Sequence, residues 1–290
     1  MTYFPFEGRR VFYTREGAGD PIIFLPNATL TGKLWEHQAE HFRQTNDVIV
    51  VDLPGFGQSD RARPSLELYV RWLDRFVDEL ELAPVALVGN CIGSLSALHY
   101  AVRRPEAVRA LVLLNMLDPV VGVAGIFKPG SGLVRYRRLR PLVETWIRHM
   151  PSPDRRHPLY WRSQFGGVRE PSQQEYLEHA RRCWADAETR LDWLALGYDG
   201  SNEGLPPADE LTGLPPVCWI WGRDNRILPY EVGKRQPEIL KPEEVHVIDG
   251  RGYAVAWDTP DEINTIIERF LARHPLSTST AAGERTPVAT

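Results

Sequence analysis

Val85-Ala86-Leu87-Val88-Gly89-Asn90-Cys91-Ile92-Gly93 is the stretch of this 290-residue chain that decides its fold. The short apolar run at its start predicts a buried strand. Gly89 and Gly93 allow a tight turn, because glycine lets two backbones crowd together where a Cβ would clash. Small and apolar residues from Ile92 to Ala101 predict a helix after the turn. The spacing is that of G-x-S-x-G, which presents a nucleophile between a strand and a helix, with Cys91 in the serine position.

The place of Cys91 at the start of a helix predicts a reactive thiol. Unpaired N–H groups and the helix dipole favour an anion there, so we expect its pKa to fall below the usual value of about 8.5. Cys91 is then expected to alkylate faster than Cys183 and Cys218. The alternative is a buried structural cysteine beside a glycine-containing turn, because two glycines at this spacing also arise by chance.

The composition indicates one globular domain with an insertion. With 290 residues and 43% hydrophobic content, the chain is long enough to bury a full core. A formal charge of −4 gives no reason to expect a nucleic acid partner. Three widely spaced cysteines indicate a reducing compartment, and neither a signal-peptide pattern nor an apolar run of membrane-spanning length is present. We therefore predict a cytoplasmic protein with no membrane partner, and a disordered tail over 275–290.

Short apolar runs alternate with helical patterns along most of the chain. A helix is predicted over Leu66–Leu82 from its periodicity. Strands are predicted at Arg10–Thr14, Pro21–Leu25, Val48–Val51, Val85–Val88, Val108–Leu114, Val217–Trp221 and Val245–Ile248. This alternation predicts an α/β fold with a mostly parallel sheet covered by helices on both faces.

The stretch 117–213 breaks this rhythm and is interpreted as an inserted helical cap. The core is then 1–116 together with 214–274, because the strand pattern resumes at Pro216; a separate second domain is the alternative. Aromatic residues of the cap favour an apolar small-molecule substrate: Trp146, Tyr160, Trp161, Phe165, Trp184 and Trp193. One half of the cap is rich in arginine, which suits the binding of an acyl carrier protein or a CoA-linked substrate; a solvated helix face is the alternative. These arginines are Arg135, Arg137, Arg138, Arg140, Arg148, Arg155, Arg156 and Arg162.

Three further segments resemble landmarks of the α/β-hydrolase superfamily. Asp52-Leu53-Pro54-Gly55-Phe56-Gly57-Gln58-Ser59-Asp60 is similar to its D-x-x-G-x-G-x-S segment. The segment from Trp221 to Pro229 resembles the loop that carries the catalytic acid. Gly250-Arg251-Gly252-Tyr253, with Pro260 after it, resembles the loop that carries the catalytic histidine. The resemblance covers nearly the whole chain except the tail and implies the α/β-hydrolase fold.

The same resemblance implies a substituted catalytic triad. The family's Ser-Asp-His corresponds here to Cys91, Asn225 and Tyr253, and Asp224 is a possible acid one residue early. The family's His-Gly after the third strand is here Pro26-Asn27. No cofactor and no metal are implied.

The resemblance also places an oxyanion site beside Cys91. The N–H groups of Ile92 and Ala28 are its expected donors, and the amides of Asn27 and Asn90 are expected to add hydrogen bonds to an enolate or carbonyl oxygen. Trp35, on the first predicted helix after the loop that carries Asn27 and Ala28, is a further possible site residue. Ordinary turn chemistry is the alternative for Asn27, Asn90 and Asn225.

No replacement base is evident, although the cap histidines stay candidates: His149, His157 and His179. Hydrolysis of an acyl-cysteine needs a base that activates water, and Asn225 and Tyr253 are poor bases at neutral pH. The leading hypothesis is a non-hydrolytic enzyme that performs elimination, cyclisation or acyl transfer on an apolar, polyketide-like biosynthetic intermediate. The alternatives are a cysteine-dependent hydrolase or thioesterase with a base from elsewhere, and an inert ligand-binding protein.

Overall fold

The computed structural model describes residues 2–117, 140–149, 158–199 and 204–276. Across these ranges one eight-stranded sheet has the order β1-β2-β4-β3-β5-β6-β7-β8. The first two pairings, β1 with β2 and β2 with β4, are antiparallel, and every other pairing is parallel. The strands are β1 (Thr2–Phe6), β2 (Arg9–Glu16), β3 (Asp20–Leu25), β4 (Asn46–Val51), β5 (Val85–Asn90), β6 (Val108–Leu114), β7 (Val217–Gly222) and β8 (Glu244–Ile248).

The sequence patterns predicted seven of these strands and missed β1. That strand is short, contains Pro5 and alternates exposed with buried residues only at Phe4 and Phe6. Proline cannot donate to a sheet ladder and is confined to edges, and β1 lies at one edge of the sheet. The predicted helix over 66–82 is α2 (Leu66–Glu79), which begins at Ser65, whose side chain accepts a hydrogen bond from the Leu68 N–H.

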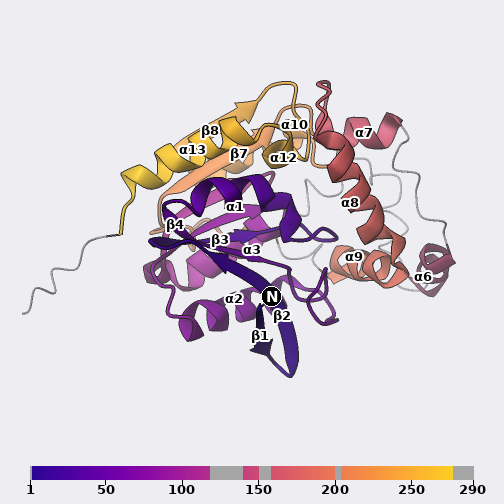
Figure 1. The fold of residues 1–290 in the computed structure, drawn as a ribbon, viewed down its shortest axis with the longest axis horizontal. Coiled ribbons are helices and arrows are strands. Elements are labelled where there is room, and N and C mark those ends of the chain that lie inside the picture. The colour runs from indigo at the N-terminus through magenta and orange to yellow at the C-terminus, as the bar shows by residue number, and fades with distance from the viewer. Residues whose placement is uncertain (1, 118–139, 150–157, 200–203, 277–290) are drawn as a thin grey trace, which may run out of the picture.

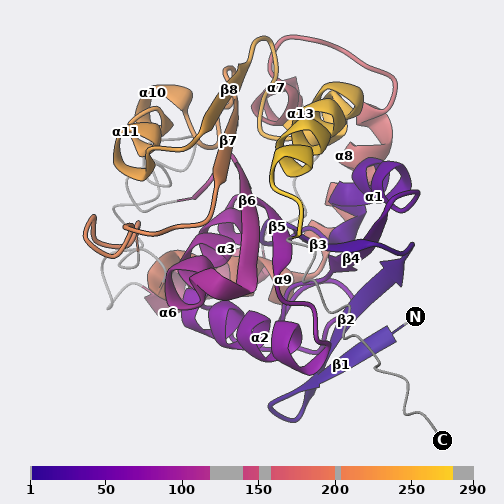
Figure 2. The ribbon, with the colours of Figure 1, turned by 90° about the vertical axis from the view of Figure 1, so that its left-hand side faces the viewer.

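Helices cover both faces of the sheet, as Figure 2 shows. On one face α2 packs with α3 (Ile92–Arg103), and on the other α1 (Glu36–Phe42) packs with α13 (Pro260–Arg273). Successive residues of β3 point to opposite faces of the sheet and pack in two separate hydrophobic cores. Ile23 and Leu25 lie in the core beneath α2 and α3, and Ile22 and Phe24 lie in the core beneath α1 and α13. The fold predicted from the alternation of strands and helices is confirmed. The remaining helices outside the cap are η1 (Gly32–Trp35), η2 (Pro105–Ala107), α10 (Tyr230–Gly233), α11 (Gln236–Leu240) and α12 (Val255–Asp258).

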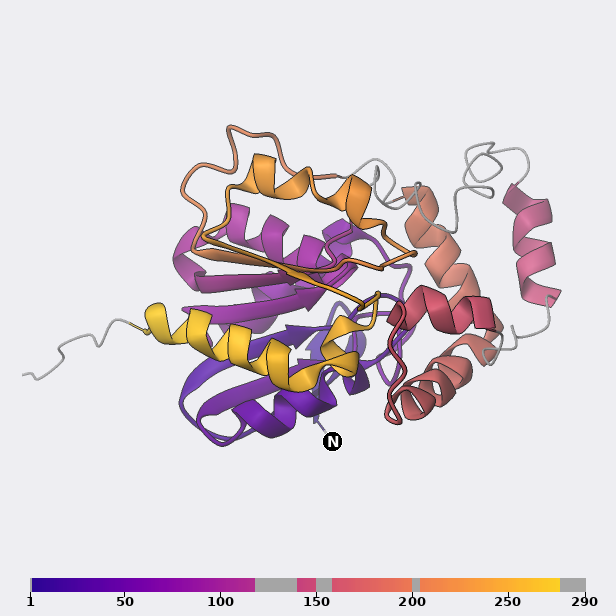
Figure 3. The same ribbon diagram turned by 90° about the horizontal axis from the view of Figure 1, so that it is seen from above.

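The described residues between β6 and β7 contain four helices, which gather at one side of the sheet (Figures 1 and 3). These cap helices are α6 (Arg140–His149), α7 (Pro158–Phe165), α8 (Gln173–Ala185) and α9 (Ala187–Asp199). The cap is fastened to the core by polar contacts. Lys33 Nζ lies 2.8 Å from a Glu175 carboxylate oxygen, Arg61 pairs with Asp192 at 3.0 Å, and the Trp257 indole N–H donates to the Ser172 carbonyl at 3.0 Å.

Several predictions concern residues outside the described ranges. These are most of the tail over 275–290, His157, and the arginines Arg135, Arg137, Arg138, Arg155 and Arg156. In the part of the chain that the structure describes, no helix combines the length and the apolar character needed to cross a membrane.

Candidate active site

Cys91 stands at a strained junction between β5 and α3. Its backbone has φ 57° and ψ −115°, a left-handed conformation that a non-glycine residue rarely adopts. The Cys91 N–H donates to the Leu114 carbonyl at 3.0 Å, which ties the turn to the end of β6. A Cβ on Gly93 would lie 2.4 Å from the Leu25 carbonyl oxygen, and one on Gly89 would lie 2.5 Å from the Ser94 nitrogen. Both glycines are therefore required by close approach, and strain at a single residue is a common property of active sites.

The thiol of Cys91 is not the activated thiolate that its helix position predicted. The residue is 8% exposed, and burial raises the pKa of the thiol to about 11. Hydrogen bonds from Tyr253 and from the Ile92 N–H lower that pKa but do not offset the burial. Desolvation disfavours the charged form more than one helix N-terminus favours it, so Cys91 is a neutral thiol at physiological pH.

Tyr253 meets Cys91 from the loop after β8. Burial raises the pKa of its hydroxyl well above 10, and the nearby Cys91 adds to that effect. The bond to Cys91 favours the protonated phenol, so the hydroxyl donates to the sulfur. The bond to Asn27 favours the deprotonated phenol, so the Asn27 amide donates to the hydroxyl oxygen. The structure thus brings the buried side chains of Cys91, Tyr253 and Asn27 close together, and none of them is charged.

Asn27 presents an acceptor to the site in addition to the amide donors that were expected. Its side-chain NH2 is used on Tyr253, and its Oδ1 is buried without a hydrogen-bond partner in the described structure. The residue is 4% exposed. Asn27 Oδ1 is therefore an acceptor that is available to a ligand, and one of the two N–H groups of its amide is used on Tyr253. Of the expected oxyanion donors, the Ile92 N–H faces the sulfur, and Ala28 is buried beside Asn27.

Among the described residues, the Asn225 side chain makes no hydrogen bond to Cys91 or Tyr253. Its Oδ1 accepts from the N–H groups of Ile227 (3.0 Å) and Leu228 (2.9 Å), and its Nδ2 donates to Asn115 Oδ1 at 3.1 Å. These contacts shape its own loop, as the alternative of ordinary turn chemistry predicts, and a catalytic role for Asn225 stays a prediction. Asn90, at the end of β5, lies on the same amide chain, because its Oδ1 is 3.4 Å from Asn115 Nδ2. The Nδ2 of Asn90 is buried and unpaired among the described residues.

Two residues named as possible site members lie elsewhere. Asp224 is exposed, and its side chain lies against Gly166 and Gly167 of the cap, so no loop shift has made it the acid. Trp35 is fully buried and packs on Phe24 with ring centroids 5.3 Å apart, in the core on the α1 and α13 face. Its aromatic bulk serves packing.

The seven histidines in the described residues make their contacts away from Cys91. His37 packs on the Trp257 ring, and a His179 ring nitrogen lies 3.0 Å from Thr31 Oγ1. The others pair with acidic side chains or backbone carbonyls: His41 with Glu268, His99 with Gly204, His149 with Thr145, His246 with Glu244 and His274 with Glu243. Burial lowers the pKa of His179 to about 4. A base supplied by one of these histidines has no support in the described geometry.

The cap packs directly on the loop that carries Tyr253. The Ala254 N–H donates to the Gln164 carbonyl at 2.8 Å, and the Tyr176 hydroxyl donates to Gln164 Oε1 at 3.0 Å. Tyr176 also raises the pKa of Tyr253, which places the two phenols near each other. Of the predicted substrate aromatics, Phe165 packs edge to face on Tyr176, and Trp184 packs on Trp193. Trp161 packs on Phe165, whereas Trp146 is 64% exposed.

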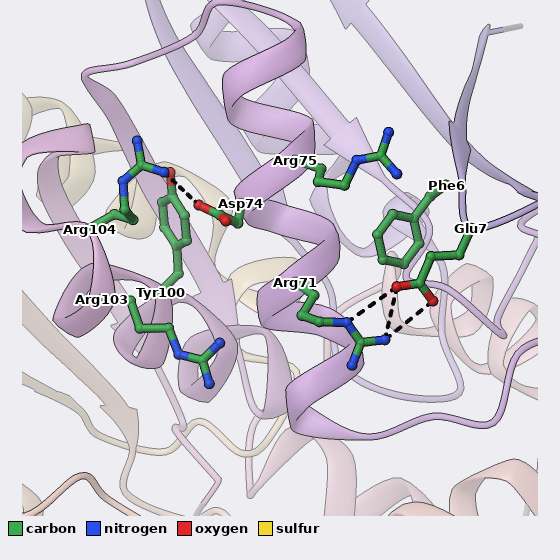
Figure 4. A pocket seen from close by; sticks show the side chains of 8 residues that line it. All are labelled: Phe6, Glu7, Arg71, Asp74, Arg75, Tyr100, Arg103 and Arg104. Carbon is green, nitrogen blue, oxygen red and sulfur yellow. Dashed lines mark hydrogen bonds and ion pairs between the residues drawn. The ribbon is translucent and has the colours of Figure 1, made fainter.

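A surface hollow of about 220 Å³ lies far along α3 from Cys91 and is not part of this site. Figure 4 shows Arg71 facing Glu7 and Arg104 facing Asp74 across it. Its arginines are matched by carboxylates, so the hollow offers no excess charge to an anion.

Cys218, Glu244 and His246 form a cluster elsewhere in the structure, and their metal-ligand-type atoms lie within 4.8 Å of one another. Its Glu244 already pairs with both Arg273 and His246, which occupies the carboxylate that a cation needs.

The chain belongs to the α/β-hydrolase fold family, whose model matches residues 20–260. It is 33% identical to (E)-2-((N-methylformamido)methylene)succinate hydrolase from Acinetobacter baylyi over 37% of this chain and 41% of that one. It is 26% identical to a 2-hydroxy-6-oxononadienedioate/2-hydroxy-6-oxononatrienedioate hydrolase from Klebsiella pneumoniae over 78% of this chain and 76% of that one. The enol-lactonase from Burkholderia xenovorans shares the fold, with a TM-score of 0.72 and 14% identity over 93% of this chain and all of that one. The first two of these proteins are named as hydrolases.

Proposed function

We propose that this protein is a non-hydrolytic enzyme that catalyses cyclisation or elimination on an apolar, enolisable carbonyl compound. The observation that carries the proposal is the neutral contact between Cys91 and Tyr253. Both groups keep their protons at physiological pH, because burial raises the pKa of the thiol to about 11 and the pKa of the phenol above its usual value. No group of this pair can activate water as a base.

A site without a base suits a substrate that enolises by itself. Compounds with alternating carbonyl groups, such as polyketide intermediates, present an enol without enzymatic deprotonation. The buried Oδ1 of Asn27 accepts a hydrogen bond from such an enol, and an enol O–H supplies the partner that this atom lacks. The names of two relatives, a hydroxy-oxo-dienedioate hydrolase and an enol-lactonase, point to the same class of enol-type compound.

The proposed reaction needs no net proton uptake. In a cyclisation, the enol carbon attacks a ketone carbon of the same molecule and forms one C–C bond. The Tyr253 hydroxyl gives its proton to the attacked ketone oxygen. The enol O–H then turns from Asn27 Oδ1 to the Tyr253 oxygen and returns a proton to it as the carbonyl re-forms. The N–H groups of Ile92 and Ala28 hold the oxygen on which negative charge develops. Loss of one water from the resulting hydroxyl compound is the elimination step.

Acyl transfer is the less favoured route, because a neutral thiol is a weak nucleophile. A second candidate, hydrolysis, is favoured only by the names of the relatives. The substrate of this proposal is a small apolar molecule. A CoA or acyl-carrier thioester is one form that it can take, and a solvated arginine-rich helix face without a carrier is the alternative.

The test uses an N-acetylcysteamine thioester of a linear poly-β-keto acid and follows products by mass spectrometry. Cyclisation alone gives an isomer of unchanged mass that is separated by chromatography, and the elimination step that follows gives a product that has lost one water; both keep the thioester. Hydrolysis releases the thiol and a free acid, and acyl transfer leaves an adduct on Cys91. We expect water loss with the wild type and a strong decrease with Tyr253→Phe. Hydrolytic turnover at the usual enzymatic rate of about 1–10³ s⁻¹ contradicts the proposal.

A further inference from the structure

We infer that Asn115 is the positioning residue of this site, because its side-chain amide sets where the Tyr253 hydroxyl stands relative to Cys91. Asn115 follows β6 directly, is fully buried and was not singled out by the sequence patterns. The inference concerns the contact between Tyr253 and Cys91, and it does not depend on which reaction the site performs.

The amide of Asn115 joins four segments that are distant in sequence. Its Nδ2 donates to the Tyr253 carbonyl at 3.0 Å and lies 3.4 Å from Asn90 Oδ1. Its Oδ1 accepts from the Gly222 N–H at 3.2 Å and from Asn225 Nδ2 at 3.1 Å. One side chain thus links the ends of β5 and β7, the loop after β7 and the loop after β8.

Only a primary amide of this length fits all four contacts. Its two N–H bonds face two oxygens, and its two lone pairs face two donors, so its full hydrogen-bonding capacity is used. Aspartate has the same shape but presents an oxygen to the Tyr253 carbonyl and to Asn90 Oδ1. The backbone of Asn115 has φ 41°, and asparagine is among the few residues other than glycine that visit this left-handed region.

This arrangement fixes Tyr253 through its backbone carbonyl and fixes Cys91 through the preceding residue, Asn90. Asn115 holds the Tyr253 carbonyl on one side and, through Asn90, the residue directly before Cys91 on the other. The hydroxyl of Tyr253 reaches the sulfur of Cys91 only while both backbones keep this spacing. Asn115 touches neither the thiol nor the phenol hydroxyl, so it acts through Tyr253.

A double-mutant cycle tests the inference without a substrate. The alkylation rate of Cys91 by iodoacetamide is measured at pH 8–9 by peptide mass mapping in the wild type, Tyr253→Phe, Asn115→Ser and the double variant. We expect Tyr253→Phe to slow alkylation about 2- to 10-fold in the wild-type background, because the thiolate loses one hydrogen bond. In the Asn115→Ser background, Tyr253→Phe is expected to change nothing further.

Two additional variants separate positioning from general stability. Asn115→Asp keeps the volume and is expected to abolish the Tyr253→Phe effect in the same way, which covers the case that Asn115→Ser does not fold. Asn264→Asp, at a buried asparagine on α13, is expected to lower the melting temperature and keep the full Tyr253→Phe effect. An equal Tyr253→Phe effect with and without Asn115 overturns the inference, and so does the absence of that effect in the wild type. Failure of the proposed function is detected separately, by the thioester assay described above, so the two failures can be distinguished.

Discussion

The Tyr253 hydroxyl donates a hydrogen bond to the Cys91 sulfur, and neither group is charged at physiological pH. In the α/β-hydrolase pattern these positions correspond to the histidine and the serine, where the histidine accepts the proton of the nucleophile. Here the direction of donation is reversed, because a phenol with a raised pKa gives a hydrogen bond more readily than it takes a proton. If the reversal holds, it accounts for the non-hydrolytic reaction that we propose, because neither group is then a base for water.

Cys183 is expected to alkylate before Cys91, and Cys91 before Cys218. Cys183 is partly exposed, Cys91 is 8% exposed, and Cys218 is fully buried with its thiol pKa pushed further up. The Cys91 rate should rise with pH toward about 11, because only the thiolate reacts and its fraction grows about tenfold for each pH unit below the pKa. Timed iodoacetamide labelling with peptide mapping measures all three rates, and Cys183→Ser serves as the control that removes the fast phase. If Cys91 is instead labelled before Cys183 at pH 7, its thiol is activated, as its position at the helix N-terminus predicted.

Gly252→Ala is expected to separate the cap from the Tyr253 loop. A Cβ on Gly252 would lie 2.5 Å from the Gln164 carbonyl oxygen and 2.7 Å from the Gly166 nitrogen. Both are backbone atoms, so relief requires movement of the chain, and we expect a loss of about 1–3 kcal/mol in the free energy of unfolding. Urea denaturation measures it. Gly167→Ala is the matched control, because the nearest atom to its new Cβ is 3.8 Å away and no positive φ strains it; a change within about 0.5 kcal/mol is expected there.

His179 makes the cap contact sensitive to acid. Burial lowers its pKa from 6.5 to about 4, so the unfolded chain binds a proton more readily than the native one in this interval. Its contribution to stability is therefore complete above about pH 6.5 and is lost as the pH falls toward 4, by on the order of 1–3 kcal/mol. The charged groups around it are Lys33, Arg182, Glu36 and Glu175.

The difference in unfolding free energy between the wild type and His179→Gln, measured from pH 7.5 to 4, isolates this contribution from the other titrations. The difference should shrink or reverse in sign as the pH falls. A difference that stays constant across the interval would show that His179 titrates normally in the folded protein.

The fold could be predicted from the sequence because its signals are local. Apolar runs, a strand-turn-helix glycine pair and helical periodicity each lie within about ten residues. Only β1 was missed, since its pattern is interrupted by Pro5. The turn role of Asn225 is also local, because its Oδ1 accepts from residues two and three positions ahead, and this pattern is common for asparagine.

The electrostatics of the site could not be predicted in the same way. The pKa of Cys91 depends on burial by segments that are far apart in the chain, and the motif carries no record of them. A helix N-terminus is visible in the sequence, whereas the desolvation that outweighs it is not. Asn115 escaped notice for the same reason, although a polar residue directly after a buried strand beside the elbow was the available signal.

Tyr253→His is expected to restore ester hydrolysis in part. An imidazole beside the Cys91 thiol can accept its proton and later activate water, and general-base assistance contributes about 10²–10⁴-fold. The gain should lie at the lower end, about 10²-fold, because the expected acid position does not support the new histidine: the side chain of Asn225 is held by Asn115, Ile227 and Leu228. Turnover of p-nitrophenyl butyrate at pH 7.5 measures the change, and Cys91→Ala in the same background should remove it.

Adding Asn225→Asp to Tyr253→His is expected to give no further gain. The new carboxylate would keep the contacts to Ile227 and Leu228 but place an oxygen against Asn115 Oδ1, where an N–H now lies. Repulsion there disturbs the amide that holds the Tyr253 carbonyl, so the double variant should lose stability without gaining rate. A large rate increase from Asn225→Asp would instead mean that residue 225 reaches the catalytic groups. In that case the weak hydrolysis that we expect of this chain would depend on Asn225 as well as on Cys91 and Tyr253, and the contact between Cys91 and Tyr253 would not be its cause.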